Sequence, residues 1–259
     1  MKKTPSNKPL PIPYTNNQKK TTMQRIPEPE LMMDDEQARA YALADFEQHH
    51  SMFIQLFLEH FPNDQITGHV LDLGCGTADI TRRFAQAFVQ CQMEGVDDSE
   101  SMLNYGRQQI EKYYLTDRVR LLKGYLPGAK LAVERYDAVI SNSLLHHLAE
   151  PKVLWNTIKA VAAPEAPIFI MDLMRPESPT QAKIITNQYT QDEPDILQQD
   201  FYNSLLAAYR IDEVQKQLQD VGLEHFDVHE VSDRHLVVMG KLSIDCQKRR
   251  GARGKNRIF

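Results

Sequence analysis

The stretch VLDLGCGTAD, residues 70–79, places a carboxylate and two glycines where a backbone turn can hold a ligand. Asp72 lies inside an apolar run, and a buried strand normally excludes an unpaired carboxylate. Gly74 and Gly76 follow, and their missing side chains let the backbone approach a ligand closely. These residue types indicate a ligand-binding turn at the end of a strand.

The glycine spacing argues against a dinucleotide. A dinucleotide-binding turn reads G-x-G-x-x-G and holds the pyrophosphate at the N-terminus of the following helix. Here the third glycine position is occupied by Asp79, whose charge would oppose a pyrophosphate. A dinucleotide oxidoreductase is therefore disfavoured.

Strand-like and helical segments alternate around these residues. The segments HVLDLG, CQMEGVD, RVRLLKG, YDAVISN and APIFIMDL read as strands, and HFDVHEVS and RHLVVMGKL follow one another without an intervening helix. The pattern predicts a doubly wound α/β fold: a mostly parallel seven-stranded sheet with helices on both faces and an antiparallel C-terminal hairpin. Ligands bind such a sheet outside the carboxyl ends of its strands.

Charge and composition divide the 259 residues into segments. Residues 1–27 and 247–259 each carry six basic residues and no acid, so we expect disordered basic tails, whereas the remainder carries 18 basic against 35 acidic residues. We expect a helical cap over 28–62, a Rossmann-like domain over 63–246, and a helical lid inserted at about 174–209.

The cellular location is predicted from two features that the sequence lacks, a membrane-spanning run and a signal peptide. No run approaches the roughly 20 apolar residues of a membrane span, and no signal peptide is evident. The three cysteines, Cys75, Cys91 and Cys246, form neither a disulfide framework nor a metal cluster by spacing. A cytoplasmic protein without a membrane partner is expected.

The motifs together resemble class I S-adenosylmethionine-dependent methyltransferases, of the small-molecule type related to the quinone-biosynthesis enzymes. VLDLGCGTAD is similar to that family's first motif, EGVDDSESML to its second, YDAVISNSLLHHL to its fourth-strand motif and IFIMDLMRP to its fifth strand. The matches span roughly residues 69–242 in the family's order. Two departures are Ala78 at a glycine position, and Gly124 and Tyr125 where many members carry an acid that contacts adenine.

The resemblance implies a cofactor, S-adenosylmethionine, and residues that would bind it. Asp72 would accept hydrogen bonds from the cofactor's ammonium, directly or through water, and the Gly74–Gly76 backbone would lie against its methionine and ribose portions. Asp97 would take both ribose hydroxyls. The remaining predicted cofactor-binding residues are Asp98, Tyr125 and Asn142.

The adjacent histidines His146 and His147 follow the fourth strand and are the candidate catalytic bases. A structural or solvent-facing role for either one is about as well supported. We expect no metal site, because adjacent histidines rarely chelate one ion and no carboxylate cluster accompanies them in the sequence.

Substrate choice is expected to come from the cap and from the lid. The candidate substrate-binding residues are Arg175, Tyr189, Tyr202 and Tyr209. Packing of the lid against the core is the alternative role for the tyrosines, and pairing with an acid on the lid is the alternative for Arg175. The favoured function is methyl transfer to O, N or C of a small organic substrate. The alternatives are an RNA methyltransferase tethered by the basic tails, although the acidic body makes a nucleic-acid partner unfavourable, and a cofactor-binding pseudo-enzyme without activity.

Overall fold

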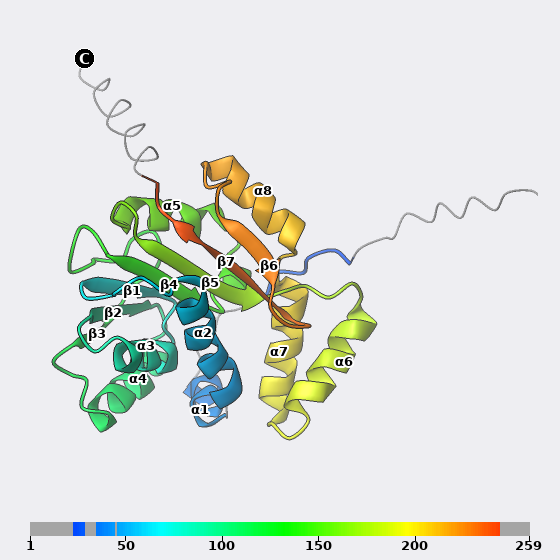
Figure 1. The fold of residues 1–259 in the computed structure, drawn as a ribbon. Helices are drawn as coiled ribbons and strands as arrows, with labels where there is room; N and C mark the ends of the chain where they lie inside the picture. Colours follow the sequence, from blue (N-terminus) through cyan, green and yellow to red (C-terminus); the bar gives the residue numbers. More distant parts are fainter. Residues whose placement is uncertain (1–22, 29–34, 45, 244–259) are drawn as a thin grey trace, which may run out of the picture.

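A computed structural model describes residues 23–28, 35–44 and 46–243, and its centre is one seven-stranded sheet. The strand order is β3-β2-β1-β4-β5-β7-β6 (Figure 1). The strands are β1 His69–Leu73, β2 Gln92–Asp97, β3 Val119–Lys123, β4 Ala138–Asn142, β5 Pro167–Leu173, β6 Asp227–Glu230 and β7 His235–Lys241. The strands β1 to β5 pair in parallel, and β7 is antiparallel to both β5 and β6. The predicted fold class is confirmed.

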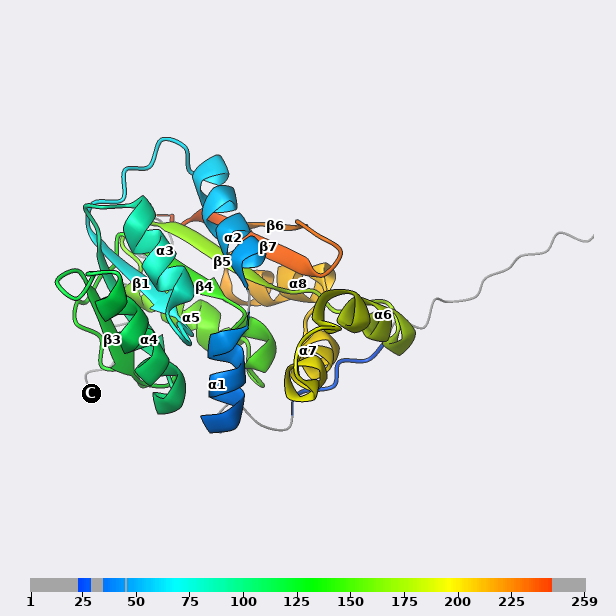
Figure 2. The ribbon, with the colours of Figure 1, turned by 90° about the horizontal axis from the view of Figure 1, so that it is seen from below.

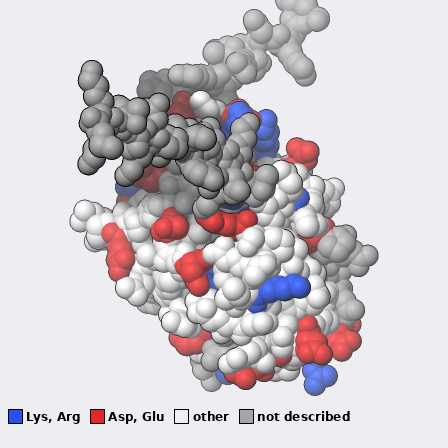
Figure 3. All heavy atoms as spheres, turned by 90° about the vertical axis from the view of Figure 1, so that its right-hand side faces the viewer, with Lys and Arg blue, Asp and Glu red and all other residues white. Residues whose placement is uncertain are grey.

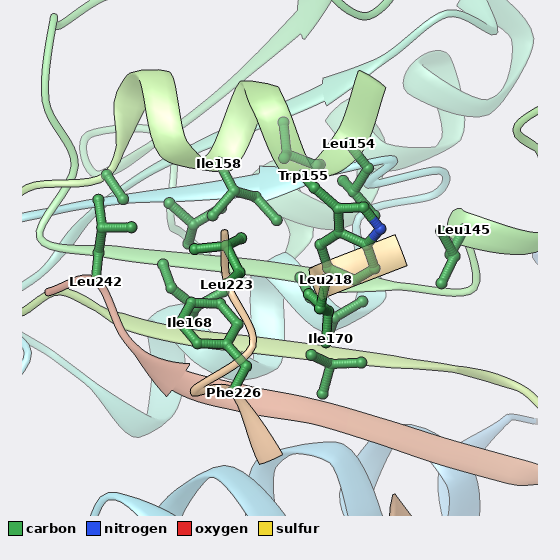
Figure 4. Close-up of a cluster of buried hydrophobic side chains, with 14 of the residues drawn as sticks. Leu145, Leu154, Trp155, Ile158, Ile168, Ile170, Leu218, Leu223, Phe226 and Leu242 are labelled. Atoms are coloured by element: carbon green, nitrogen blue, oxygen red, sulfur yellow. The ribbon is translucent and has the colours of Figure 1, made fainter. Parts of the chain in front are cut away.

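Helices cover both faces of the sheet. In Figure 1, α5 and α8 lie above the sheet and α2, α3 and α4 lie below it. These helices are α2 Glu47–His60, α3 Asp79–Ala87, α4 Glu100–Lys112, α5 Lys152–Val161 and α8 Ile211–Val221. The upper core packs Trp155 and Ile158 of α5 against Ile168 and Ile170 of β5 (Figure 4). The lower core packs phenylalanines of α2 and α3 against Phe169 of β5. Burial of these apolar side chains stabilises the sheet that positions the site.

Three further helices stand at the carboxyl ends of the parallel strands. α1 (Asp35–Leu43) lies between α4 and α7 (Asp195–Ala207), and α6 (Pro179–Thr190) packs beside α7 (Figure 2). α6 begins at Ser178, whose hydroxyl accepts a hydrogen bond from the Gln181 N–H, and Pro179 occupies the first turn. These elements place a helical layer over the end of the sheet where the glycine turn lies.

The N-terminal residues 23–28 run along α7. Ile26 N–H donates to Leu206 O, and Arg25 donates to the carbonyls of Ala207, His146 and Leu148. Arg25 also lies 4.2 Å from the ring centroid of Tyr209. The structure thus differs from the prediction of a disordered tail over 1–27 for these last residues, because buried carbonyl oxygens bind the Arg25 guanidinium. Residues 1–22 and 244–259, with the rest of the predicted tails and Cys246, lie outside the described residues.

Two further features of the described residues are the charge of their surface and the length of their helices. On the face shown in Figure 3, acidic side chains are spread widely and basic side chains lie among them as separate groups. No helix of the described ranges is both long enough and apolar enough to cross a membrane.

Candidate functional site

A pocket with a volume of about 440 Å³ lies at the carboxyl ends of β1, β2 and β4. Its lining comes from the loops after these strands, from α1 and α2, and from the lid helices α6 and α7. The pocket therefore joins the glycine turn to the histidine pair and to the cap and lid, which are far apart in the sequence. Its size is in the range of small-molecule sites.

The turn after β1 needs glycine for two reasons. Gly74 has a φ of +72°, and a Cβ at this position would lie 2.9 Å from the Leu144 Cβ. Gly76 has a φ of +52°, and Ala78 follows in the left-handed region with a φ of +59°. That conformation explains why the related motif has glycine at the position of Ala78, since a left-handed L-residue costs roughly 1–2 kcal/mol.

Asp72, the residue before the last of β1, is a buried carboxylate in the lining of the pocket. Its Oδ2 accepts a hydrogen bond from the Thr81 hydroxyl of α3 over 2.5 Å. Burial raises the pKa of Asp72 to about 7, with a further rise from the nearby Asp97 and a partial reduction by Thr81. A cationic group beside Asp72 would favour its charged form.

Asp97 ends β2 and is fixed by two backbone hydrogen bonds. Its Oδ2 accepts from the Gly76 N–H at 2.8 Å and its Oδ1 accepts from the Ser99 N–H at 2.9 Å. Burial raises the pKa of Asp97, and these two hydrogen bonds oppose the rise. The carboxylate is thus held at the edge of the glycine turn, and its remaining lone pairs can accept from a ligand.

The other predicted cofactor-binding residues also line the pocket. Asn142 ends β4, and its buried Oδ1 has no hydrogen-bond partner among the described residues. Asp98 follows Asp97 directly, and Tyr125 lies at the rim with 65% of its surface exposed. Buried acceptors such as Asn142 Oδ1 are normally hydrogen-bonded, and a donor on a bound ligand would supply the missing hydrogen bond.

The two histidines lie on a short 3₁₀ turn after β4, η1 Leu145–His147, and both line the pocket. His146 is buried, with its Nδ1 2.6 Å from Asp172 Oδ1. Asp172 also accepts from the Leu145 and Leu173 N–H groups at 2.7 Å each. Burial lowers the pKa of His146, but the Asp172 carboxylate outweighs this effect and the pKa is raised.

His147 contacts Glu28, a residue that the sequence analysis missed. Glu28 Oε2 lies against His147 Nδ1, and Glu28 Oε1 accepts from the Ser204 hydroxyl of α7 over 2.5 Å. Burial raises the pKa of Glu28, but His147 and Ser204 outweigh it and hold the pKa below its usual value. No local pattern signals this role, because Glu28 directly follows the segment read as a tail.

Asp79 entered the sequence analysis only as an obstacle to a pyrophosphate. In the structure it begins α3 and lines the pocket. Its carboxylate lies 2.7 Å from His50 Nδ1 of α2 and also pairs with Arg82 and Arg83. Burial opposes ionisation, but these three partners lower the pKa of Asp79 well below its usual value. The contacts tie the cap helix α2 to the glycine-turn helix α3.

Of the four predicted substrate-binding residues, the structure places Tyr189 in the pocket lining and the other three elsewhere. Arg175 is buried, donating to Ala208 O and to Glu213 Oε1 of α8, and these acceptors draw its side chain away from the pocket. Tyr209 donates its hydroxyl to Leu148 O, and Tyr202 packs against the core of the lid. These three residues therefore stabilise the lid and its base in this structure.

A second arginine, which was not predicted, lies in the pocket lining. Arg234 precedes β7, pairs with Asp233 at 2.8 Å and contacts His49 Nε2. Its guanidinium lies 3.3 Å from the ring centroid of Tyr189, whose hydroxyl donates to Asp233 Oδ2. The signal was weak, because a single arginine in a turn before an apolar strand has no distinctive spacing.

Comparisons with known proteins agree with this geometry. Residues 70–165 match a family model described as a methyltransferase domain. A malonyl-[acyl-carrier protein] O-methyltransferase from Priestia megaterium is 31% identical over 40% of this chain and 35% of its own length. A demethylmenaquinone methyltransferase from Lactiplantibacillus plantarum is 29% identical over 43% of this chain and 47% of its own length. The similarity thus spans less than half the length of each of these two relatives.

Solved structures share the fold over a larger part of the chain. A SAM-dependent methyltransferase from Aquifex aeolicus has a TM-score of 0.58 at 20% identity and covers 81% of this chain and 98% of its own. A protein from Methanococcus maripaludis, described as a putative S-adenosyl-L-methionine-dependent methyltransferase, has a TM-score of 0.62 at 14% identity, covering 84% and 97%. These structures confirm the predicted fold, and the match over residues 70–165 agrees with the methyltransferase resemblance of the motifs.

Proposed function

We propose that this chain is an S-adenosylmethionine-dependent methyltransferase that acts on a small organic acceptor. The observation that carries the proposal is the position of Asp97, which is fixed by Gly76 in the same pocket as Asp72 and the histidine pair. The matching methyltransferase domain covers the first motif, the second motif and the histidine turn. The proposal names the acceptor only by its chemical class, a small organic molecule, and leaves open which of its atoms accepts the methyl group.

The residues of the pocket fit the chemistry of the cofactor. S-adenosylmethionine carries a sulfonium, an ammonium, an α-carboxylate and a ribose diol but no phosphate, and carboxylates of the protein suit its ammonium and its diol. Asp72, Asp97 and Asp98 supply carboxylates at one side of the pocket. Two glycines with positive φ leave room there for a close approach to the backbone. We assign the ribose hydroxyls to Asp97 and the ammonium to Asp72.

The cofactor, when bound, supplies an activated methyl group, and the chain has to hold an acceptor in line with it. Positioning within about 3–3.5 Å of the methyl carbon is the main catalytic contribution that such a transfer needs. Tyr189 and Phe201 of the lid and Phe46 of the cap also line the pocket. We propose that these aromatic side chains position the acceptor and exclude water.

His146 and His147 belong to the part of the pocket lining that we assign to the acceptor. An acceptor that arrives as a phenol, an alcohol or an ammonium has to lose a proton on transfer. We therefore assign proton removal to this end of the pocket. The Asp172 contact fixes His146 with Nδ1 as the donor, so its Nε2 is the nitrogen that can accept.

Calorimetric titration with S-adenosylmethionine and with S-adenosylhomocysteine tests the cofactor assignment. Two charge-assisted hydrogen bonds of about 1.5 kcal/mol each correspond to a roughly 100-fold loss of affinity when Asp97 is replaced by Ala. The control Asp227→Ala changes an exposed acid at the start of β6, away from the pocket, and should bind as the wild type does. Binding of neither ligand by the wild-type chain, or equal binding by Asp97→Ala, would contradict the proposal.

A further inference from the structure

We propose that Glu28, His146 and His147 form a binding site for one divalent transition-metal ion at the acceptor end of the pocket. Each of these residues offers one ligand atom, and the three atoms lie within 4.8 Å of one another. The sequence analysis argued against a metal because adjacent histidines rarely chelate one ion and no carboxylate cluster accompanied them. On the 3₁₀ turn, however, the centroids of the two rings lie 4.0 Å apart. The structure also supplies a carboxylate, Glu28, which is distant in the sequence and is brought to His147 by the segment 23–28 along α7.

The donor set indicates the kind of ion. Two imidazoles and one carboxylate suit Zn²⁺, Fe²⁺ or Co²⁺ better than Mg²⁺ or Ca²⁺, which prefer oxygen ligands. The ligands of a tetrahedral Zn²⁺, each about 2.0–2.1 Å from the ion, lie roughly 3.3 Å apart. The three atoms of this group lie within 4.8 Å of one another, so small side-chain movements would close the site. Three protein ligands leave a fourth position open, which is typical of catalytic rather than structural zinc.

The surroundings orient two of the three ligands. Metal-binding histidines usually donate their other ring nitrogen to a carboxylate, and His146 does so through Nδ1 to Asp172 at 2.6 Å. This contact leaves Nε2 to bind an ion. Glu28 is oriented in the same way, because its Oε1 accepts from Ser204 while its Oε2 faces His147. Both side chains are therefore held before an ion arrives.

The local charge favours a cation. Glu28, Asp172 and Asp200 place three carboxylates around the histidine pair, and the proximity of Glu28 adds to the effect of burial in raising the pKa of Asp200. Arg25 is the opposing charge, but its guanidinium is taken up by the carbonyl oxygens of Ala207, His146 and Leu148 and by the Tyr209 ring. With both imidazoles neutral, as metal ligands are, the three carboxylates exceed this one positive charge, so a divalent ion would neutralise a charge excess in a half-buried site.

The role of the ion in transfer rests on the proposed function. An ion at this end of the pocket would bind the acceptor's oxygen or nitrogen at its open position and lower the pKa of that group. The histidines would then act as ligands, and the acceptor's proton would leave to solvent before transfer.

Metal titration tests the site without any knowledge of the acceptor. The chain is stripped with a chelator and titrated with Zn²⁺ against a competing chromophoric chelator, and the bound metal is measured by mass spectrometry. Substitution with Co²⁺ reports the geometry through visible absorption bands. We expect one ion per chain, with affinity reduced at least tenfold in Glu28→Gln and in His147→Ala. The control His69→Ala, an exposed histidine at the start of β1, should leave binding unchanged.

S-adenosylhomocysteine binding is measured on the same samples. A chain that binds S-adenosylhomocysteine but no Zn²⁺ or Co²⁺ would overturn the metal site and leave the proposed function intact. Stoichiometric metal binding that is equal in the wild type, Glu28→Gln and His147→Ala would also overturn the assignment. Retained S-adenosylhomocysteine binding by the two variants shows that they are folded, so a loss of metal binding in them is attributable to the lost ligand.

Discussion

The Thr81 hydroxyl of α3 donates a hydrogen bond of 2.5 Å to the buried Asp72 carboxylate at the end of β1. The bond links the first strand to the helix that follows the glycine turn. One hydroxyl does not replace the lost hydration of a carboxylate, and burial raises the pKa of Asp72 to about 7. The site thus contains a carboxylate that is costly to ionise until a cation binds.

The first prediction concerns the stability of the cofactor-free chain. Because the folded-state pKa of Asp72 lies above its unfolded value, the folded chain holds the proton more tightly, and stability falls as pH rises from about 4 to about 7. Asp72→Asn removes this cost. At pH 8 the variant should exceed the wild type by up to about 4 kcal/mol in the free energy of unfolding, and the difference should shrink toward pH 4. Urea unfolding at both pH values measures it. An equal loss of stability in the variant at both pH values would contradict the account.

The second prediction concerns the pKa of His146. The Asp172 carboxylate raises this pKa against the effect of burial, so Asp172→Asn should lower it and leave the imidazole neutral over a wider pH range. NMR titration of the ring protons measures the shift directly. The control Asp227→Asn changes an exposed acid at the start of β6 and should leave the pKa of His146 as it is in the wild type. An unchanged pKa of His146 in Asp172→Asn would show that the contact does not control its protonation.

The third prediction separates backbone strain from close packing at the glycine turn. Gly74 and Gly222 have nearly equal φ values, +72° and +75°. A Cβ at position 74 would meet Leu144 at 2.9 Å, whereas at position 222 the nearest atom, Lys159 Nζ, is 4.0 Å away. Gly222→Ala should therefore lose about 1 kcal/mol of stability and keep its affinity for S-adenosylhomocysteine. Gly74→Ala should lose about 1–3 kcal/mol more and bind the ligand more weakly. Thermal unfolding and calorimetry measure both, and equal behaviour of the two variants would contradict this assignment.

The fourth prediction concerns Arg25. Its guanidinium binds three carbonyl oxygens, two of them in the turn that carries the histidine pair. Arg25→Ala should lower the free energy of unfolding by about 2 kcal/mol, because these carbonyls lose a charged donor. The control Arg39→Ala changes an exposed arginine on α1 and should have little effect. Denaturant unfolding gives both values. Equal stability of Arg25→Ala and the wild type would show that the segment 23–28 adds nothing to the fold.

The sequence predicted those parts of the fold and of the site that depend on local sequence patterns. The first motif placed Asp72, Gly74 and Gly76 together because a strand, a turn and a helix follow one another within ten residues. Asp97 was found through the resemblance of EGVDDSESML to the family's second motif, and the parallel pairing of β1 with β2 brings its carboxyl end beside the glycine turn. The antiparallel β7 was predicted because no helix separates it from β6.

Contacts between residues that are far apart in the sequence could not be predicted from local sequence patterns. Glu28 reaches His147 only through the path of the N-terminal segment along α7, and no spacing in the sequence encodes that path. For Arg175 the sequence left open a substrate carboxylate or an acid of the protein as the partner, and the structure pairs it with Glu213 at the start of α8. Arg234 lines the pocket from the turn before β7. In each case the tertiary fold decides which charges meet.

Transfer of a labelled methyl group tests the central claim most directly. The full chain is incubated with S-adenosylmethionine labelled in its methyl group and with a cell extract, which is then separated into small-molecule, RNA and protein fractions. The account predicts label in the small-molecule fraction with the wild type and none above background with Asp97→Ala. Label in RNA that disappears after nuclease treatment, or no transfer to any fraction by a chain that binds the cofactor, would contradict it.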